Sequence, residues 1–180
     1  LNDSADDLAA ALGGRGGPLS ASRLLAVGVF LGSLAGAWFA GLSTSDFVAH
    51  LDRQVHAIHC AFRPGAGPQL GESGCKAVMM SPYSSFFRDQ LWGGLPVALW
   101  ALAVFAFLAY RSLAIALRGQ VRRSDTFFLL AATCLPVGMS VIYGYLAVLE
   151  VGATCLICVG IYVSSGICLL FAVLAHGMAP

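Results

Sequence analysis

The chain has 180 residues, of which 58% are hydrophobic and only 11% are charged. Because soluble domains carry about 25% charged residues, this composition cannot cover the surface with polar groups in water, and we expect the chain in a lipid bilayer. The net charge of +1 argues against a nucleic-acid partner, which requires clustered lysines and arginines.

The N-terminal part of the chain predicts a tail followed by a membrane span. Residues 1–23 are polar and Gly-rich, which favours a flexible cytoplasmic tail. Residues 24–42 are apolar, carry no charge and are just long enough to cross a bilayer as a helix. A cleavable signal peptide is the alternative, since the Ala-Gly-Ala at 35–37 resembles a cleavage site. The length of the run favours a retained span.

Three glycines recur within this first span. Gly28, Gly32 and Gly36 are spaced four residues apart and so share one face of a helix. Small residues at this spacing let a second helix approach closely in a membrane. They therefore predict a packing face for another span.

The segment 43–92 is the one long polar region. A connection of this length inside a compact domain favours a functional lid or a binding loop. It contains Cys60 and Cys75, with His56 and His59 just before the first of them. Three interpretations stay open: the histidines and cysteines are soft metal ligands, the imidazoles lower the pKa of Cys60, or they are ordinary polar residues on a wet loop.

Three further apolar segments are long enough to span the bilayer, namely residues 93–110, 126–149 and 154–175. Pro96 falls in the first turn of the second span, where proline is tolerated, and Pro136 predicts a kink in the third. The sequence therefore predicts an all-α integral membrane protein, a four-helix transmembrane bundle with a long external loop after the first span. The redox domain is expected over 24–176, and 177–180 is a short stub.

The distribution of arginines predicts the orientation of the bundle. The tail carries two arginines and the short connection after the second span carries four, whereas the long first loop carries four basic residues spread over about fifty positions and the turn after the third span carries none. Since basic residues gather on the cytoplasmic side, the tail, the second connection and the C-terminus are expected in the cytoplasm. We therefore expect a multi-pass protein of the bacterial inner membrane, with the long loop on the periplasmic side, an oxidising compartment.

Cys155 and Cys158 form a C-x-x-C pair where the fourth span begins. At a helix start their side chains lie on one face, close enough for a disulfide or for one metal ion, and one thiol pKa is lowered. Packing of two small residues is the plainer alternative. Val159 follows Cys158, so the haem-attachment form with histidine is absent. The mid-span Cys134 and Cys168 are interpreted as small apolar residues.

Both cysteine pairs are expected on the external face, which permits a relay. A thiolate of one pair can attack the disulfide of the other and pass two electrons. A soluble thioredoxin-fold protein is the expected donor at the loop, and a lipid-soluble quinone is the expected acceptor at the membrane edge. Ser81, six residues after Cys75, either caps a helix start or donates to a quinone oxygen.

On these motifs the chain resembles the vitamin K epoxide reductase family, including its bacterial disulfide-forming members. The matching features are Ser81 six residues after Cys75, the Gly-x-Pro before the second span, the C-x-x-C that opens the fourth, and Tyr162 four residues after Cys158. The similarity extends from the first span to the end of the chain. It differs from the DsbB family, in which the C-x-x-C lies in the first external loop.

The resemblance implies a role for each matching residue. Cys60 exchanges with the partner protein, and Cys75 passes electrons inward to Cys155. Cys158 faces the quinone, which is ubiquinone or menaquinone. Tyr162 hydrogen-bonds a quinone oxygen, unless it is only an interfacial aromatic residue.

We therefore expect a quinone-dependent thiol-disulfide oxidoreductase whose thioredoxin-fold partner, similar to DsbA, is either separate or fused beyond residue 180. A rival hypothesis is a vitamin K quinone or epoxide reductase proper. Vertebrate members hold vitamin K with an asparagine in the second span, and this chain has no asparagine after Asn2. A Cys/His metal carrier and a structural four-span protein with incidental cysteines are two further hypotheses.

Overall fold

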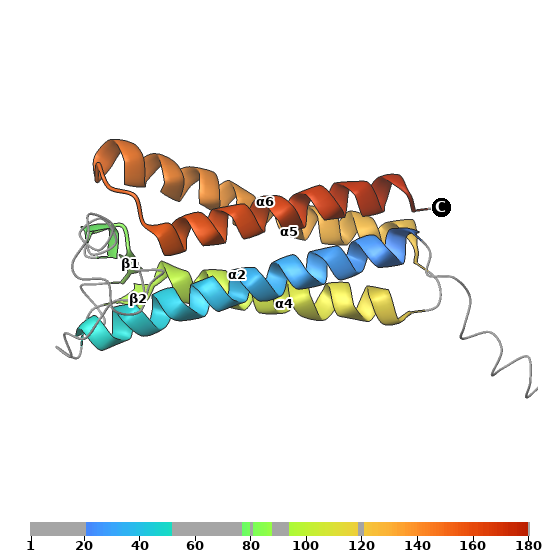
Figure 1. Cartoon of the computed structure of the whole chain (residues 1–180), viewed down its shortest axis with the longest axis horizontal. Helices are drawn as coiled ribbons and strands as arrows, with labels where there is room; N and C mark the ends of the chain where they lie inside the picture. The colour runs from blue at the N-terminus through green and yellow to red at the C-terminus, as the bar shows by residue number, and fades with distance from the viewer. Residues whose placement is uncertain (1–20, 52–76, 80, 88–93, 119–120, 180) are drawn as a thin grey trace, which may run out of the picture.

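The computed structural model describes residues 21–51, 77–79, 81–87, 94–118 and 121–179. Nearly all of them are helical, and the long helices run side by side as one elongated bundle (Figure 1). These helices are α2 (Ala21–Leu51), α4 (Val97–Leu117), α5 (Arg123–Tyr145) and α6 (Leu156–Gly177). Within the described residues, four helical segments qualify as membrane spans by length and composition. The predicted all-α membrane bundle is confirmed.

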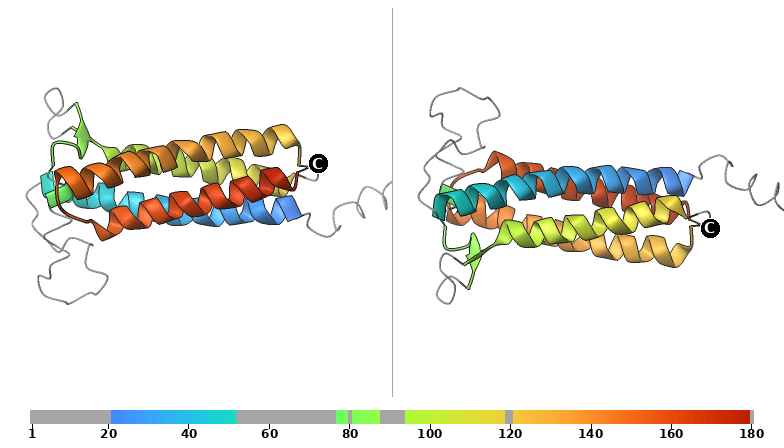
Figure 2. Two further views of the ribbon diagram at one scale, coloured as in Figure 1. Left: turned by 90° about the horizontal axis from the view of Figure 1, so that it is seen from above. Right: turned by 90° about the horizontal axis from the view of Figure 1, so that it is seen from below.

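The two ends of the bundle differ in chemistry. The arginine end is defined by five arginines near the start of α2 and the α4–α5 connection: Arg23, Arg111, Arg118, Arg122 and Arg123. The opposite, cysteine end carries the start of α6 and a short β-pairing, as both views of Figure 2 show. At the arginine end the side chain of Arg23 donates to the Ala116 carbonyl oxygen at 2.9 and 3.1 Å, which joins α2 to α4.

Helix boundaries depart from the hydrophobic runs at several points. Helix α2 continues past residue 42 to Leu51, through polar residues that bond within the helix. Thr44 Oγ1 donates to the Ala40 carbonyl and Ser45 Oγ to that of Leu42, each at 2.8 Å. Helix α5 is followed without a break by a π-helical turn, η1 (Leu146–Glu150), before the chain turns at Gly152 with φ +65°.

Small residues on α2 set the spacing of the bundle. A Cβ atom on Gly28 would lie 2.7 Å from the Phe171 ring of α6, and one on Gly32 would lie 3.0 Å from Cys168 Sγ. The third glycine of the series, Gly36, faces the ring of Phe105 on α4 in the same way. The predicted packing face is confirmed, and it serves two neighbouring helices.

The core lies between the four long helices, and hydroxyl groups within it donate to nearby backbone carbonyls. Phe105 and Cys168 are completely buried there. Ser33 Oγ donates to the Val29 carbonyl at 2.8 Å and lies 3.5 Å from Cys168 Sγ. Cys134 is instead exposed on the outer surface of α5.

A short β-pairing closes the cysteine end. Strand β1 (Ser85–Phe86) pairs antiparallel with β2 (Leu95–Pro96), directly before α4. Gly94 precedes β2 with φ +76°, and a Cβ there would lie 2.6 Å from the Phe86 carbonyl oxygen. Glycine is therefore required at this close approach. The pairing holds the neighbouring Ser84 against α4, since Val97 N–H donates to the Ser84 carbonyl at 3.0 Å.

Candidate functional site

The C-x-x-C pair forms the N-terminus of α6. Cys155 is the N-cap residue, and the backbone N–H of Cys158 donates to its Sγ at 3.4 Å. Cys155 is only 5% exposed and packs with Ile157. The partly buried residues around the pair come from α2 and the segment before β1: Phe39, Leu42 and Val78. The prediction that the two cysteines share one face at a helix start is confirmed.

This environment changes the acidity of Cys155, which lies just outside the membrane-spanning part of α6. A hydrogen bond from the Cys158 side chain lowers the pKa of the Cys155 thiol, and backbone hydrogen bonds from Cys158 and Ile157 act in the same direction. Burial and the nearby carboxylate of Asp46 raise it, but the lowering effects dominate. Cys155, at the start of the helix, is thus the member of the pair whose thiolate form is stabilised.

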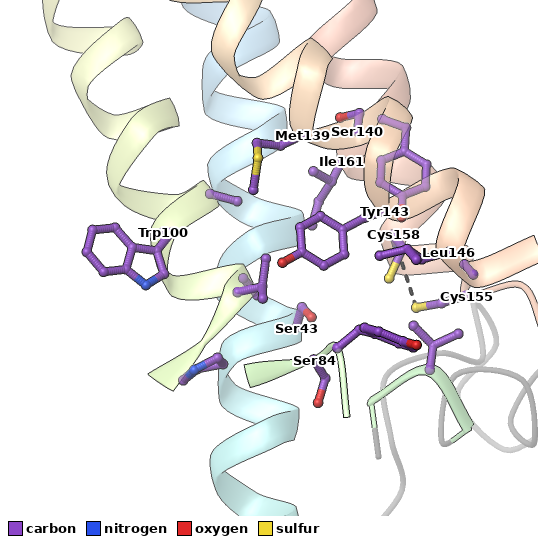
Figure 3. Close-up of a pocket in the computed structure, with 18 of the residues that line it drawn as sticks. Ser43, Ser84, Trp100, Met139, Ser140, Tyr143, Leu146, Cys155, Cys158 and Ile161 are labelled. Carbon is purple, nitrogen blue, oxygen red and sulfur yellow. Dashed lines mark hydrogen bonds between the residues drawn. The ribbon is translucent and has the colours of Figure 1, made fainter. Parts of the chain in front are cut away.

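A cavity of about 230 Å³ adjoins both cysteines. Its walls come from α2, the segment 78–84, α4, α5, η1 and α6, and they are predominantly apolar. Figure 3 shows Cys155 and Cys158 at one side of this cavity and Trp100 of α4 at the other. A cavity of this kind, mostly apolar with a few polar groups, is typical of a site for a small organic molecule.

Ser81 borders the cavity, as expected for a residue that supports the site. It follows the helical residues 77–79 instead of beginning a helix, so its interpretation as a cap at a helix start is wrong. Its hydroxyl donates backwards to the Val78 carbonyl at 2.7 Å. Donation to a quinone oxygen stays a prediction.

Tyr162 borders the same cavity one turn after Cys158. Its ring lies against the backbone of α5, since a Cβ on Gly144 would be 3.7 Å from Tyr162 Cε2. The structure therefore brings together four of the predicted site residues: Ser81, Cys155, Cys158 and Tyr162. Cys60, Cys75, His56 and His59 lie outside the described residues.

A model of the vitamin K epoxide reductase family matches residues 27–173, which is most of the chain. The chain belongs to the vitamin K epoxide reductase family. Members of this family are membrane oxidoreductases whose chemistry involves vitamin K and related quinones. No curated protein matches the chain.

Sequence reasoning missed several polar residues of this family member's cavity, namely Ser43, Tyr83, Ser84, Ser140 and Tyr143. Tyr143 on α5 borders the cavity together with Pro136, Ser140 and Ala147. These four positions recur at intervals of four, three and four residues, so they share one helix face. That periodicity was available in the sequence, but nothing in it indicated which face of the apolar span turns inward.

The described part of the chain contains no cluster of three or more His, Cys, Asp or Glu side chains that could hold a metal ion. The proposed ligands His56, His59, Cys60 and Cys75 are not among the residues described. The metal-carrier interpretation therefore stays a prediction from the sequence.

Proposed function

We propose that this protein forms disulfides by oxidising the thiols of a thioredoxin-fold partner and passing the electrons to a membrane quinone. The observation that carries the proposal is the apolar cavity bordered by both Cys155 and Cys158. We place the protein in the bacterial inner membrane with the cysteine end on the periplasmic side. Cys60 and Cys75 then receive electrons from the partner and pass them to the C-x-x-C pair.

The cavity suits the head group of a quinone. A quinone ring is flat and apolar on both faces and carries carbonyl oxygens that only accept hydrogen bonds. The walls offer apolar contacts for the ring and hydroxyl groups for its oxygens. The volume of about 230 Å³ is below the usual range for drug-sized ligands, which is about 300–1,000 Å³, so it accepts a ring without its tail.

The cavity also borders the lipid-facing surface, which allows an isoprenoid tail to remain in the membrane. Trp100, Leu135 and Met139 line the cavity, yet they are 54%, 64% and 41% exposed on the outside of the bundle. They come from α4 and α5, and α4 packs far more extensively on α2 than on α5. A head group can therefore enter between α4 and α5.

The cysteines act in a defined order under this proposal. The Cys75 thiolate attacks the Cys155–Cys158 disulfide at Cys155, and the S–S bond breaks to release Cys158 as the thiolate beside the cavity. Cys60 then attacks Cys75 and frees Cys155, whose lowered pKa favours its departure as a thiolate. A bound quinone supplies the two-electron acceptor and takes up two protons. The sum is one partner dithiol oxidised and one quinone reduced.

Quinone reduction by the purified protein tests the proposal. The donor is a reduced thioredoxin-fold protein, and the acceptor is a soluble ubiquinone or menaquinone analogue followed by its absorbance. We expect turnover by the native protein and by Cys134→Ala, since Cys134 is exposed away from the cavity. Cys60→Ala and Cys158→Ala should each abolish it. Turnover that survives Cys158→Ala, or stoichiometric bound metal without turnover, would refute the proposal.

A further inference from the structure

The hydroxyl groups around the cavity differ in whether they already donate their hydrogen to another group of the protein. A serine hydroxyl carries one hydrogen, and three cavity serines donate theirs to backbone carbonyls. Ser81 Oγ donates to Val78 at 2.7 Å, Ser84 Oγ to Ser81 at 2.9 Å and Ser140 Oγ to Pro136 at 2.6 Å. In this arrangement these serines can accept a hydrogen bond, and each would have to give up its bond to the backbone in order to donate to a carbonyl oxygen.

Four more hydroxyls border the cavity, from Ser43, Tyr83, Tyr143 and Tyr162. Of these, Tyr143 comes from the part of α5 that faces Tyr162, since a Cβ added to the next residue, Gly144, would lie 3.7 Å from Tyr162 Cε2. Figure 3 shows Tyr143 among the side chains that surround the cavity, in the same part of the view as Cys158. Among the described residues, no hydrogen-bond partner is found for the Tyr143 hydroxyl. Two phenols from neighbouring helices are thus available on one side of the cavity.

The backbone of α5 changes directly after the residues that face the cavity. After Tyr145 the helix widens into the π-helical turn η1, whose residues Leu146 and Ala147 also line the cavity. A π-helical turn shifts the register of the face that follows it, and such turns recur at functional sites. Tyr143 lies just before this turn and Ala147 lies within it, and both border the cavity.

We propose that Tyr143 is a quinone-selecting residue, whose hydroxyl donates to a ring substituent next to the carbonyl that Tyr162 binds. The inference rests on the proposed function. Ubiquinone carries methoxy oxygens beside its carbonyls, so two neighbouring phenols each find an acceptor on one edge of the ring. A naphthoquinone has a fused ring or an alkyl group at those positions, and the Tyr143 hydroxyl then loses its hydrogen bond in an apolar site. The site accordingly prefers ubiquinone-type benzoquinones.

Binding to a redox-silent protein tests this inference without turnover. In the Cys158→Ala background, the affinities of a ubiquinone analogue and a menaquinone analogue are measured by quenching of tryptophan fluorescence, since Trp100 lines the cavity. We expect Tyr143→Phe to weaken the ubiquinone analogue about five- to tenfold, as for one lost hydrogen bond. Binding of the menaquinone analogue should stay unchanged. Tyr162→Phe should weaken the binding of both analogues.

The matched control is Tyr145→Phe, on the same helix but 60% exposed and outside the cavity lining. It should alter neither affinity. If Tyr143→Phe weakens both quinones equally or neither of them, while the parent protein binds them, the inference fails and the proposed function stands. If the parent protein binds no quinone at all, the proposed function fails and the inference fails with it.

Discussion

The backbone N–H of Cys158 donates a hydrogen bond to Sγ of Cys155 over 3.4 Å. Cys155 thereby occupies the position in which serine, threonine or aspartate usually accepts from the first turn of a helix. A negative charge is stabilised there by the helix dipole as well. The spacing of the C-x-x-C motif therefore does two things at once, since it caps α6 and prepares one sulfur to become a thiolate.

The first prediction concerns the pH dependence of Cys155. The hydrogen bond from the Cys158 side chain is the largest effect that lowers the pKa of Cys155. Cys158→Ala removes this donor, so the Cys155 titration should move to higher pH and its thiolate fraction at neutral pH should fall. The check is thiolate ultraviolet absorbance against pH, with the other four cysteines replaced by alanine. Cys158→Ser keeps a hydrogen-bond donor, so the pKa of Cys155 should stay lowered in this variant. If Cys155 titrated alike in Cys158→Ser and Cys158→Ala, this explanation would be contradicted.

Much of this site was predictable from sequence because it lies within one short segment. Cys155, Cys158 and Tyr162 are spaced by three and four residues on one helix, and helix geometry alone brings such residues to one face. The glycines of α2 were predictable for the same reason. Tyr143 was not, since its role depends on how α5 is rotated against α6, and apolar residues surround the helix on every side. The continuation of α2 to Leu51 was only partly predictable, because Thr44 and Ser45 satisfy their hydroxyls inside the helix.

The second prediction tests the close packing of α2. A Cβ on Gly36 would collide with the ring of Phe105, which is completely buried and has little room to move. Gly36→Ala should therefore lower stability by about 1–3 kcal/mol, as for overpacking of a core. The measurement is thermal unfolding in detergent. Gly41→Ala on the same helix is the matched control, since nothing lies within 4 Å of a Cβ there. Gly41→Ala should not lower stability, because alanine has the higher helix propensity, and an equal loss in both variants would contradict the packing explanation.

The third prediction concerns the charges at the arginine end. Asp125 lies 3.7 Å from Arg111 and 3.4 Å from Arg118, and its side chain is only 17% exposed. Arg111 also lies over the Phe128 ring at 5.1 Å. Asp125→Asn leaves the largely buried Arg111 without its counter-charge and should cost about 1–3 kcal/mol, as for a buried donor left without its partner. Arg118→Gln affects an exposed side chain and should cost less than about 0.5 kcal/mol. Thermal unfolding compares the two variants, and a larger loss in Arg118→Gln would contradict the assignment.

The fourth prediction concerns orientation in the membrane, on which the role of the cysteines depends. The arginine end gathers five arginines, whereas the described residues of the cysteine end contain Asp46 and Glu150 but no lysine or arginine. Basic residues mark the cytoplasmic side, so the cysteine end should face outwards.

Single cysteines in a background without native cysteines check this orientation. Glu150→Cys places an exposed thiol at the cysteine end, and Ser124→Cys places one at the arginine end without removing a charge. A membrane-impermeant maleimide should label Glu150→Cys in intact cells and Ser124→Cys only after the membrane is opened. The reverse pattern would put Cys155 and Cys158 on the reducing side, where glutathione and thioredoxin keep thiols reduced. An oxidase of periplasmic thiols cannot operate from that side, so this outcome would overturn the proposed direction of electron flow together with the orientation.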